Sequence, residues 1–469
     1  MIHSSSIPSP AVEGPITAGM GRPFVASTFF DLARVGYSET EYFLSGSAAA
    51  YTAASPLTDD GKWKVAPGEA AAYRTRVVVY RPIDAQRFNG TVFVEWLNVS
   101  GGLDAAPDWI MGHTQLIRSG CAWVGVSAQQ VGVEGGSTPL GMPAMPLKTT
   151  DPQRYGSLRH PGDSFSYDIF SQAAQAIRQH TGISALDDLS VKSVIAVGES
   201  QSAFRLVTYV NAVHPLRNVY DGFLVHSRGG VAAPLSEPSP TAIAFPGAVP
   251  IRDDLDVPVM IFQTETDLTL LGSYAARQPD SARLRLWEVA GTAHADTYTV
   301  GVGANDLGDS PEVVNLVLAA MPVPGLEVSR PINSGPQHFV LKAALSALNE
   351  WVRRGTAPPI APRLEVSAGP PVAIVRDAHG NAVGGVRTPQ VDVPIATLSG
   401  DGDGASLFTA LFGHTAPFDA AKLAALYANH DAYVRAVHAA TERAVRAGFI
   451  VPADAALITA AAAASDIGR

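Results

Sequence analysis

The chain has 469 residues, of which 46% are hydrophobic and 16% charged, and its formal net charge is −10. This composition is typical of globular proteins and excludes a disordered chain. No long run of one charge sign occurs, and a basic surface for binding nucleic acid is therefore excluded. The length is about twice that of an ordinary domain, which predicts one large domain with insertions and an added C-terminal region.

Cys121 is the one cysteine in the sequence, so no intrachain disulfide can form. A reducing compartment is compatible with this, and we expect Cys121 to be a small core residue. The first residues, MIHSSSIPSPAVEGP, lack a basic region followed by an apolar stretch, which favours a cytoplasmic location unless a leader has been trimmed away. No apolar run of about 18 residues occurs, so no membrane span is expected. The oligomeric state stays open, a homo-oligomer included.

The first half of the chain changes character near residue 66. Residues 1–65 are rich in Ser, Pro, Gly and Ala with little periodicity, which predicts a partly irregular layer over the main domain. Short apolar strands and one helix follow, at 73–82, 90–102, 107–120 and 122–129. This β-loop-α-β order predicts a parallel sheet that is covered on both faces.

Two insertions interrupt the pattern. Residues 130–164 and 231–250 are rich in Gly, Pro, Met, Ala or Ser, and loops this long inside a domain usually serve function or act as lids. Around them the alternation continues, with strands at 191–200, 219–230, 257–267 and 282–294 and helices at 166–180, 201–214 and 337–355. The sequence therefore predicts a doubly wound, mostly parallel α/β sheet with helices on both faces over residues 66–358. Ligands of such sheets bind at the carboxyl ends of the strands.

The C-terminal region, residues 359–469, has a different composition. It begins with Pro-rich sequence, passes a predicted hairpin around 377–386, and ends in Ala-rich segments of high helix propensity, including 451–465. We expect an extension that packs on the main domain. It carries no catalytic motif of its own.

The main chemical signal is Gly198-Glu199-Ser200-Gln201-Ser202, which lies between an apolar strand and a helix. A nucleophile elbow needs small residues on both sides of the serine because the turn is sharp and strained. Ser202 replaces the usual second glycine and is still small. Ser200 is thus the candidate nucleophile, although a helix N-cap serine would look similar.

An oxyanion hole needs two donors in this architecture. The backbone N–H of Gln201 lies at a helix N-terminus, where one donor is normally found. The second is expected from the Gly-rich loop 97–102, at Asn98 or its neighbours.

The acid and the base should follow the serine in chain order. Two carboxylates come just after the strand 257–267: Asp267 is the first candidate and Glu265 the second. His294 follows the next strand in a small-residue turn and is the first candidate for the base, with His338 as the alternative. His226 ends another strand and is a candidate for lining the pocket.

No sequence pattern indicates a metal or cofactor site. The chain has no H-E-x-x-H motif, no paired cysteines, no phosphate-binding G-x-x-x-x-G-K-[ST] and no dinucleotide fingerprint. We therefore expect an enzyme without metal or cofactor.

With these residues assembled, the chain resembles the α/β-hydrolase superfamily, and in particular a bacterial "alpha/beta hydrolase domain" family. The resemblance covers roughly residues 20–465 and is carried by VEWLNVSGG, GESQSAFRL, ARQPDSARLRLWEVAGTAHAD, GPQHFVLKAALSALNEWV and GGVRTPQVDVP. It implies hydrolysis of a small-molecule carboxylic ester through an acyl-enzyme, but it implies no particular substrate. It also leaves the choice between His294 and His338 open. An acyltransferase with the same residues and a non-catalytic binding protein on the same fold are the alternatives.

Overall fold

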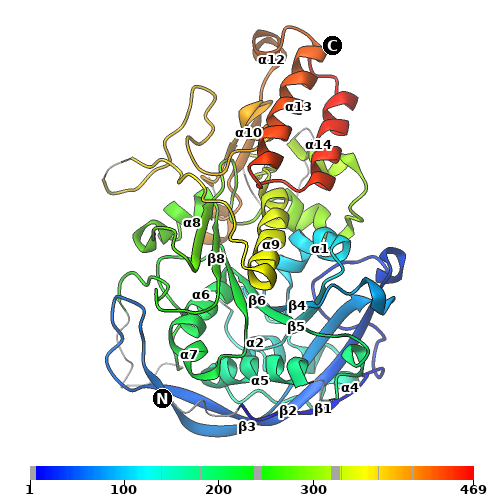
Figure 1. The fold of residues 1–469 in the computed structure, drawn as a ribbon, viewed down its shortest axis with the longest axis vertical. Coiled ribbons are helices and arrows are strands. Elements are labelled where there is room, and N and C mark those ends of the chain that lie inside the picture. The colour runs from blue at the N-terminus through cyan, green and yellow to red at the C-terminus, as the bar shows by residue number, and fades with distance from the viewer. Residues whose placement is uncertain are drawn as a thin grey trace.

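The structure of the chain, a computed structural model, describes residues 7–138, 140–179, 182–236, 246–317, 328, 330–367, 369–402 and 406–469 (Figure 1). Of the expected insertion at 231–250, residues 237–245 lie outside the described residues. Within the described part, no helix is both long and apolar enough to cross a bilayer.

Within the described residues, nine strands form one sheet in the order β1-β2-β3-β5-β4-β6-β7-β8-β9. The strands are β1 (Ala11–Glu13), β2 (Tyr37–Ala53), β3 (Val65–Pro82), β4 (Thr91–Trp96), β5 (Ala122–Val126), β6 (Ser193–Glu199), β7 (Gly222–His226), β8 (Val259–Gln263) and β9 (Leu284–Glu288). The six strands from β5 to β9 run parallel, whereas β1, β2 and β3 form an antiparallel edge. The carboxyl ends of β6, β7, β8 and β9 therefore meet at one edge of the sheet.

Two apolar layers cover the parallel strands, as their continuous hydrophobicity predicts. On one face, helices α5 (Ser166–Gln179) and α6 (Gln201–Thr208) pack against alternate residues of β4 such as Val92 and Val94. On the other face, α1 (Pro107–Arg118) and α9 (Gln337–Arg354) pack around Phe93. Gly355 ends α9 in the left-handed conformation, which glycine adopts without steric cost.

The N-terminal segment is more regular than the sequence indicates. Residues 37–53, expected in a partly irregular layer, form the long strand β2, which pairs antiparallel with β3 along its length. The small residues Ser45 to Ala50 give no clear alternation of polar and apolar side chains, and the strand exists because β3 supplies its hydrogen bonds.

Short helices occupy the first insertion. α2 (Gln130–Glu134), α3 (Leu147–Thr150) and α4 (Pro152–Tyr155) replace the loop that the sequence predicts there. The buried guanidinium of Arg154 donates to the carboxylate of Glu41 on β2 and to the carbonyls of Ala18 and Gly21. These bonds tie the insertion to the N-terminal strands.

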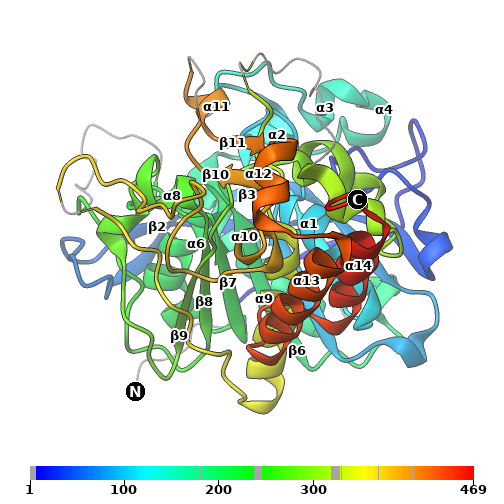
Figure 2. The same cartoon turned by 90° about the horizontal axis from the view of Figure 1, so that it is seen from above.

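The C-terminal region packs over the end of the sheet at which α8 (Glu265–Thr269) lies, opposite the antiparallel strands β1, β2 and β3 (Figure 1). It contains α10 (Pro389–Asp392), β10 (Ala396–Ser399), α11 (Leu407–Ala410), β11 (His414–Pro417), α12 (Ala420–Leu426), α13 (His430–Arg446) and α14 (Pro452–Ala464), and Figure 2 shows α13 and α14 side by side. The predicted hairpin near 377–386 is a tight turn from Asp377 to Asn381, flanked by single bridges rather than regular strands.

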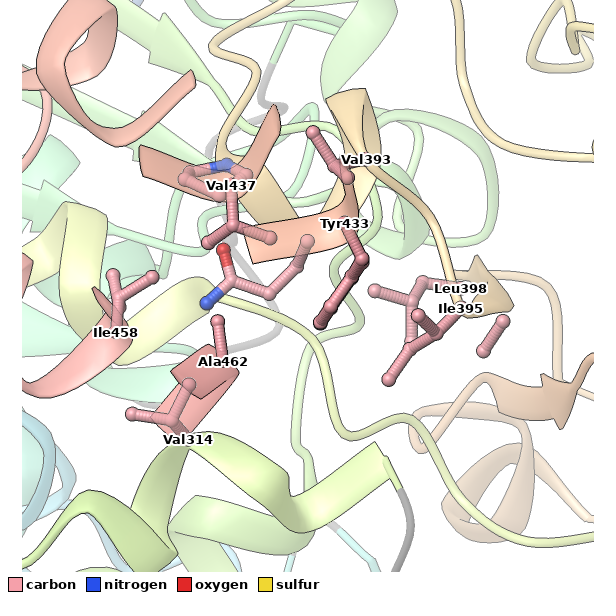
Figure 3. Close-up of a pocket in the computed structure, with 11 residues that line it drawn as sticks. Val314, Val393, Ile395, Leu398, Tyr433, Val437, Ile458 and Ala462 are labelled. Carbon is pink, nitrogen blue, oxygen red and sulfur yellow. The ribbon is translucent and has the colours of Figure 1, made fainter. Parts of the chain in front are cut away.

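An apolar cavity of about 40 Å³ lies inside this C-terminal layer, between α13, α14 and β10 (Figure 3). Val393, Tyr433 and Ile458 are among the residues that line it. Ligand pockets are usually about 300–1,000 Å³, so this cavity is too small for a typical substrate. The carboxyl edge of the parallel sheet, where ligands of such sheets bind, is therefore the expected place for the functional site.

Candidate active site

Ser200 lies at a sharp turn between β6 and α6. Its backbone has φ 57° and ψ −121°, a conformation that residues other than glycine rarely adopt. The N–H of Ser200 donates to the carbonyl of His226 at 2.9 Å, and the carbonyl of Ser200 accepts from Phe204 at 3.1 Å to begin the helix. A Cβ on Gly198 would lie 3.1 Å from Ser202 Cβ, which explains why the motif needs small residues at both flanking positions.

The Ser200 hydroxyl points at His294. Its Oγ lies 2.8 Å from His294 Nε2, and His294 Nδ1 lies 2.7 Å from Asp267 Oδ1. Asp267 belongs to α8, directly after β8, and His294 follows β9. Because Asp267 accepts from Nδ1–H, Nε2 is left free to accept from the serine hydroxyl. The first candidates for nucleophile, base and acid thus lie in one hydrogen-bonded chain.

The Asp267 carboxylate is held in place from its other side. Its Oδ2 accepts the N–H of Thr264 at 2.6 Å, and the Thr264 hydroxyl accepts the N–H of Asp267, which makes a capping box at the start of α8. Burial opposes its ionisation, but the hydrogen bond and charge of His294 outweigh burial, and the pKa of Asp267 lies below its ordinary value. Asp267 is therefore an ionised, oriented partner for the imidazole.

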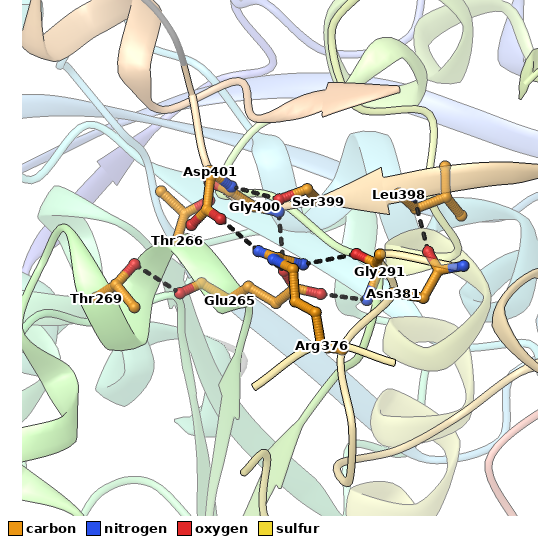
Figure 4. A network of polar contacts seen from close by, with 12 residues as sticks. Glu265, Thr266, Thr269, Gly291, Arg376, Asn381, Leu398, Ser399, Gly400 and Asp401 are labelled. Carbon is orange, nitrogen blue, oxygen red and sulfur yellow. Dashed lines mark hydrogen bonds and ion pairs between the residues drawn. The ribbon is translucent and has the colours of Figure 1, made fainter. Parts of the chain in front are cut away.

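Glu265, the second candidate acid, has different partners (Figure 4). Its buried carboxylate accepts the N–H of Gly291 at 2.6 Å and that of Gly400 at 3.0 Å, and it pairs with Arg376 Nη2 at 3.1 Å. Gly291 precedes His294 in the same turn, whereas Gly400 and Arg376 belong to the C-terminal region. Glu265 thus fastens the His294 turn to the C-terminal extension.

Asn333 fastens the same turn a second time. Its side-chain amide donates to the carbonyls of Gly291 and Ser399, and the N–H of Ala295 donates to Leu411 O at 3.2 Å. The C-terminal extension, which carries no catalytic motif, therefore fixes the position of His294.

His338 lies apart from this chain of contacts. It is in the first turn of α9, buried, with its ring stacked on Tyr298 at 3.8 Å between centroids and beside Phe339 at 3.9 Å. Burial, aided by the charge of Lys342, holds the pKa of His338 well below its ordinary value. The contacts that the structure gives this imidazole are aromatic, and they do not include Ser200.

His226 is hydrogen-bonded to the elbow and to two neighbouring side chains. Besides its carbonyl bond to Ser200, its Nδ1 lies 2.8 Å from Asp108 Oδ1, and its Nε2 lies 3.2 Å from the amide nitrogen of Gln337. The side chain is fully buried. His226 thus belongs to the buried residues that are in contact with Ser200.

The two candidate oxyanion residues are placed differently. Gln201 begins α6, so its N–H lies at the helix N-terminus as expected. Asn98 uses its backbone N–H for Ala105 O at 2.8 Å and its side-chain amide for Glu199 O and Oε2, both at 3.1 Å. Within the same loop, the N–H groups of Val99 and Gly101 have no acceptor among the described residues.

Two buried carboxylates next to this site, Glu199 and Asp108, are not among the residues that the sequence indicates as functional. Glu199 filled the variable position of the elbow motif, and Asp108 was one of many helix-start carboxylates. The available signal for Glu199 was a carboxylate directly adjacent to a candidate nucleophile.

Trp96, Trp109 and Trp287 are buried with their indole N–H groups bonded to protein acceptors, in keeping with core positions.

Cys121 is buried, and burial raises the pKa of its thiol to about 12, as for an unreactive core residue. Across the described residues, no three His, Cys, Asp or Glu side chains are grouped so that they could hold a metal.

A family model described as an alpha/beta hydrolase domain matches residues 12–460. No curated protein matches the chain. Together with the sheet order, the family match confirms the fold class expected from the sequence.

Three solved structures illustrate what the chain is similar to. One chain from a structural analysis of two fungal esterases of Rhizomucor miehei matches with 10% identity over 67% of this chain and 85% of that chain, with a TM-score of 0.33. A thermostable esterase of Pseudomonas putida matches with 13% identity, coverage of 51% and 66%, and a TM-score of 0.26. A glucuronoyl esterase of Solibacter usitatus matches with 9% identity, coverage of 61% and 81%, and a TM-score of 0.30.

Proposed function

Because this chain belongs to the alpha/beta hydrolase domain family, we propose that it is a serine hydrolase that cleaves small-molecule carboxylic esters through an acyl-enzyme. One observation carries the proposal: the continuous hydrogen-bonded chain from Ser200 Oγ to His294 Nε2 and from His294 Nδ1 to Asp267. A serine hydroxyl is a weak nucleophile until a positioned base removes its proton, and this chain supplies that base with its own orienting acid.

The reaction follows from these contacts. Ser200 Oγ attacks the ester carbonyl while its proton passes to His294 Nε2, and a tetrahedral intermediate forms. The imidazolium then gives this proton to the leaving alcohol oxygen as the C–O bond breaks, which leaves the acyl group on Ser200. Water repeats both steps, with His294 again as base and then acid, and releases the carboxylic acid.

The negative oxygen of the intermediate needs donors that are already in place. The N–H of Gln201 is one, at the start of α6. We assign the second to the N–H of Val99, a buried position in the loop after β4, because the N–H and the amide of Asn98 are already engaged. In this arrangement Asn98 does not donate to the oxyanion. Its side-chain amide holds Glu199, and the next residue, Val99, donates to the oxyanion.

The test of this function is direct detection of the covalent intermediate. Mixing the protein with p-nitrophenyl acetate and quenching early is expected to give an acetylated peptide that contains Ser200, measured by mass spectrometry, alongside release of acetate and nitrophenol. Adding an alcohol acceptor separates hydrolysis from acyl transfer, because a transferase would form the new ester in preference to acetate. Absence of both turnover and acylation over a series of acyl chain lengths would favour the binding-protein alternative.

The bracing of His294 by the C-terminal extension gives a second expected result. In Arg376→Met, buried Glu265 loses its cationic partner, and its pKa, already raised by burial, rises further. We expect the free energy of unfolding to fall by about 1–3 kcal/mol, less than for a fully buried pair because the Arg376 side chain remains 21% exposed. We expect kcat to fall by about 10-fold as the His294 turn loosens.

Arg387→Met is the matched control for that variant. Arg387 lies in the same extension and pairs with Asp392 at 2.8 Å, but it makes no contact with Glu265 or the His294 turn among its bonds. Denaturant unfolding and ester kinetics on both variants separate bracing of His294 from general damage to the extension. Equal kcat for wild type and Arg376→Met would contradict the bracing role.

A further inference from the structure

A second carboxylate lies beside the catalytic hydrogen bond. Glu199 Oε1 is 3.3 Å from His294 Nε2, the same nitrogen that faces Ser200 Oγ at 2.8 Å. Asn98 orients this carboxylate by donating its side-chain amide to Glu199 Oε2 at 3.1 Å. The imidazole therefore has a carboxylate at each nitrogen, with Asp267 at Nδ1 and Glu199 at Nε2.

The elbow does not require an acid at this position. The turn needs small residues at 198 and 202, while the residue before the serine is free to vary. Here it is a carboxylate whose side chain is 9% exposed, and among the residues that the structure describes no arginine or lysine pairs with it. Burying an ionisable group in this way is costly, and such costs are typical of functional sites.

The charge of Glu199 is set by several neighbours. Burial raises its pKa to about 7; the neighbouring His294 and His226 oppose the rise, and the carboxylates of Asp108 and Asp267 add to it. In return, Glu199 and Asp267 raise the pKa of His294 against the effect of burial. The protonation of each of these two groups therefore depends on that of the other.

We propose that Glu199 is a positioning residue of this site, whose ionised carboxylate stabilises protonated His294 at Nε2 during the reaction. The proposal rests on the proposed esterase function. His294 becomes an imidazolium when it takes the Ser200 proton, and it stays one until the leaving alcohol takes that proton. Charge at Nε2 develops only in this interval, so a carboxylate at 3.3 Å stabilises the transition states more than the resting enzyme.

This role gives a pH signature. Above about pH 7 Glu199 is ionised and stabilises protonated His294. Below that pH, Glu199 takes up a proton and this stabilisation is lost. Glu199→Gln keeps the shape and the Asn98 contact but never carries charge. The kcat of the variant should therefore be close to that of wild type at pH 6 and become lower than that of wild type as the pH rises.

The experiment compares wild type with Glu199→Gln in two measurements. For p-nitrophenyl acetate, we expect kcat at pH 8 to fall about 10- to 100-fold with little change in KM, and the ratio of wild type to variant to approach one near pH 6. By NMR, the pKa of the His294 imidazole is expected to fall in the variant, with His294→Ala used to assign its signal. An equal loss of kcat at every pH, or an unchanged His294 pKa, would overturn the proposal.

Asp296→Asn is the matched control. Asp296 is also buried with a pKa raised by burial, to about 6, but its carboxylate accepts hydrogen bonds from Thr299 and from the backbone of Tyr298, and the rise in the pKa of His294 comes from Glu199 and Asp267 instead. We expect it to leave both the His294 pKa and the shape of the pH profile unchanged. A shift in this control as large as that in Glu199→Gln would overturn the specific role of Glu199.

Folding of the variant is checked independently. Because the pKa of Glu199 is raised in the folded protein, its ionisation costs stability as the pH rises from its ordinary range to about 7. Glu199→Gln is therefore expected to melt no lower than wild type at pH 8. If wild type hydrolyses no ester, the proposed function fails, and the NMR titration still decides whether Glu199 acts on His294.

Discussion

Replacing Ser200 with alanine is expected to lower kcat/KM for activated esters by about 10⁴- to 10⁶-fold. The variant keeps the fold, because the serine hydroxyl contributes one partly buried hydrogen bond, to His294 Nε2. It loses the atom that forms the acyl bond, so a loss of this size is expected even though the oxyanion donors remain. Ester hydrolysis followed over the whole pH range measures the effect.

Ser202→Ala is the control for that prediction. Ser202 is buried two residues along in the first turn of α6, and its hydroxyl has no hydrogen-bond partner among the described residues. We expect it to keep activity within a few-fold and to react with a fluorophosphonate probe, which Ser200→Ala should not. Labelling of the Ser200→Ala protein at another residue would show that the nucleophile lies elsewhere.

The second large effect concerns the histidines. His294→Ala is expected to lose about as much kcat as Ser200→Ala, because a base and its nucleophile act as a unit. His338→Ala should keep kcat within a few-fold and instead lose stability, by about 1–3 kcal/mol, because its ring fills a buried stack with Tyr298. Kinetics and urea unfolding on both variants should therefore give opposite patterns: kcat falls mainly in His294→Ala, and the free energy of unfolding falls in His338→Ala.

The double variant His294→Ala/Ser200→Ala tests whether the two residues act together. If they do, its residual rate equals that of either single variant, since the second change removes nothing further. A collapse of kcat in His338→Ala with intact unfolding behaviour would reverse the assignment of the base. The aromatic surroundings of His338 argue against that outcome.

The sequence supplied the local parts of the candidate site. Small residues around Ser200 identify the elbow because sterics at a sharp turn act over a few neighbouring residues, and the positive φ of Ser200 agrees with that reasoning. Chain order supplied Asp267 and His294, since each directly follows a strand whose apolar run is visible in the sequence. Alternating strands and helices likewise predicted the doubly wound sheet.

Choices between chemically similar residues needed the tertiary structure. Glu265 and Asp267 are two positions apart on one turn, and which of them contacts His294 depends on side-chain direction and on partners more than 100 residues away, at Arg376 and Gly400. The same is true of His338, whose aromatic stack with Tyr298 joins a π-helical turn to the start of α9.

By itself, then, the sequence determined the fold class and predicted the elbow at Ser200 and the chain order of the candidate acid and base, because these depend on patterns carried by adjacent residues. Only the tertiary structure decided that β2 is a strand, that the C-terminal extension braces His294, and that Glu199 lies against His294 Nε2. Each of these depends on contacts between segments distant in the chain. Hydrogen bonds and charges act over a few ångströms in space, and sequence separation does not reveal which groups come that close.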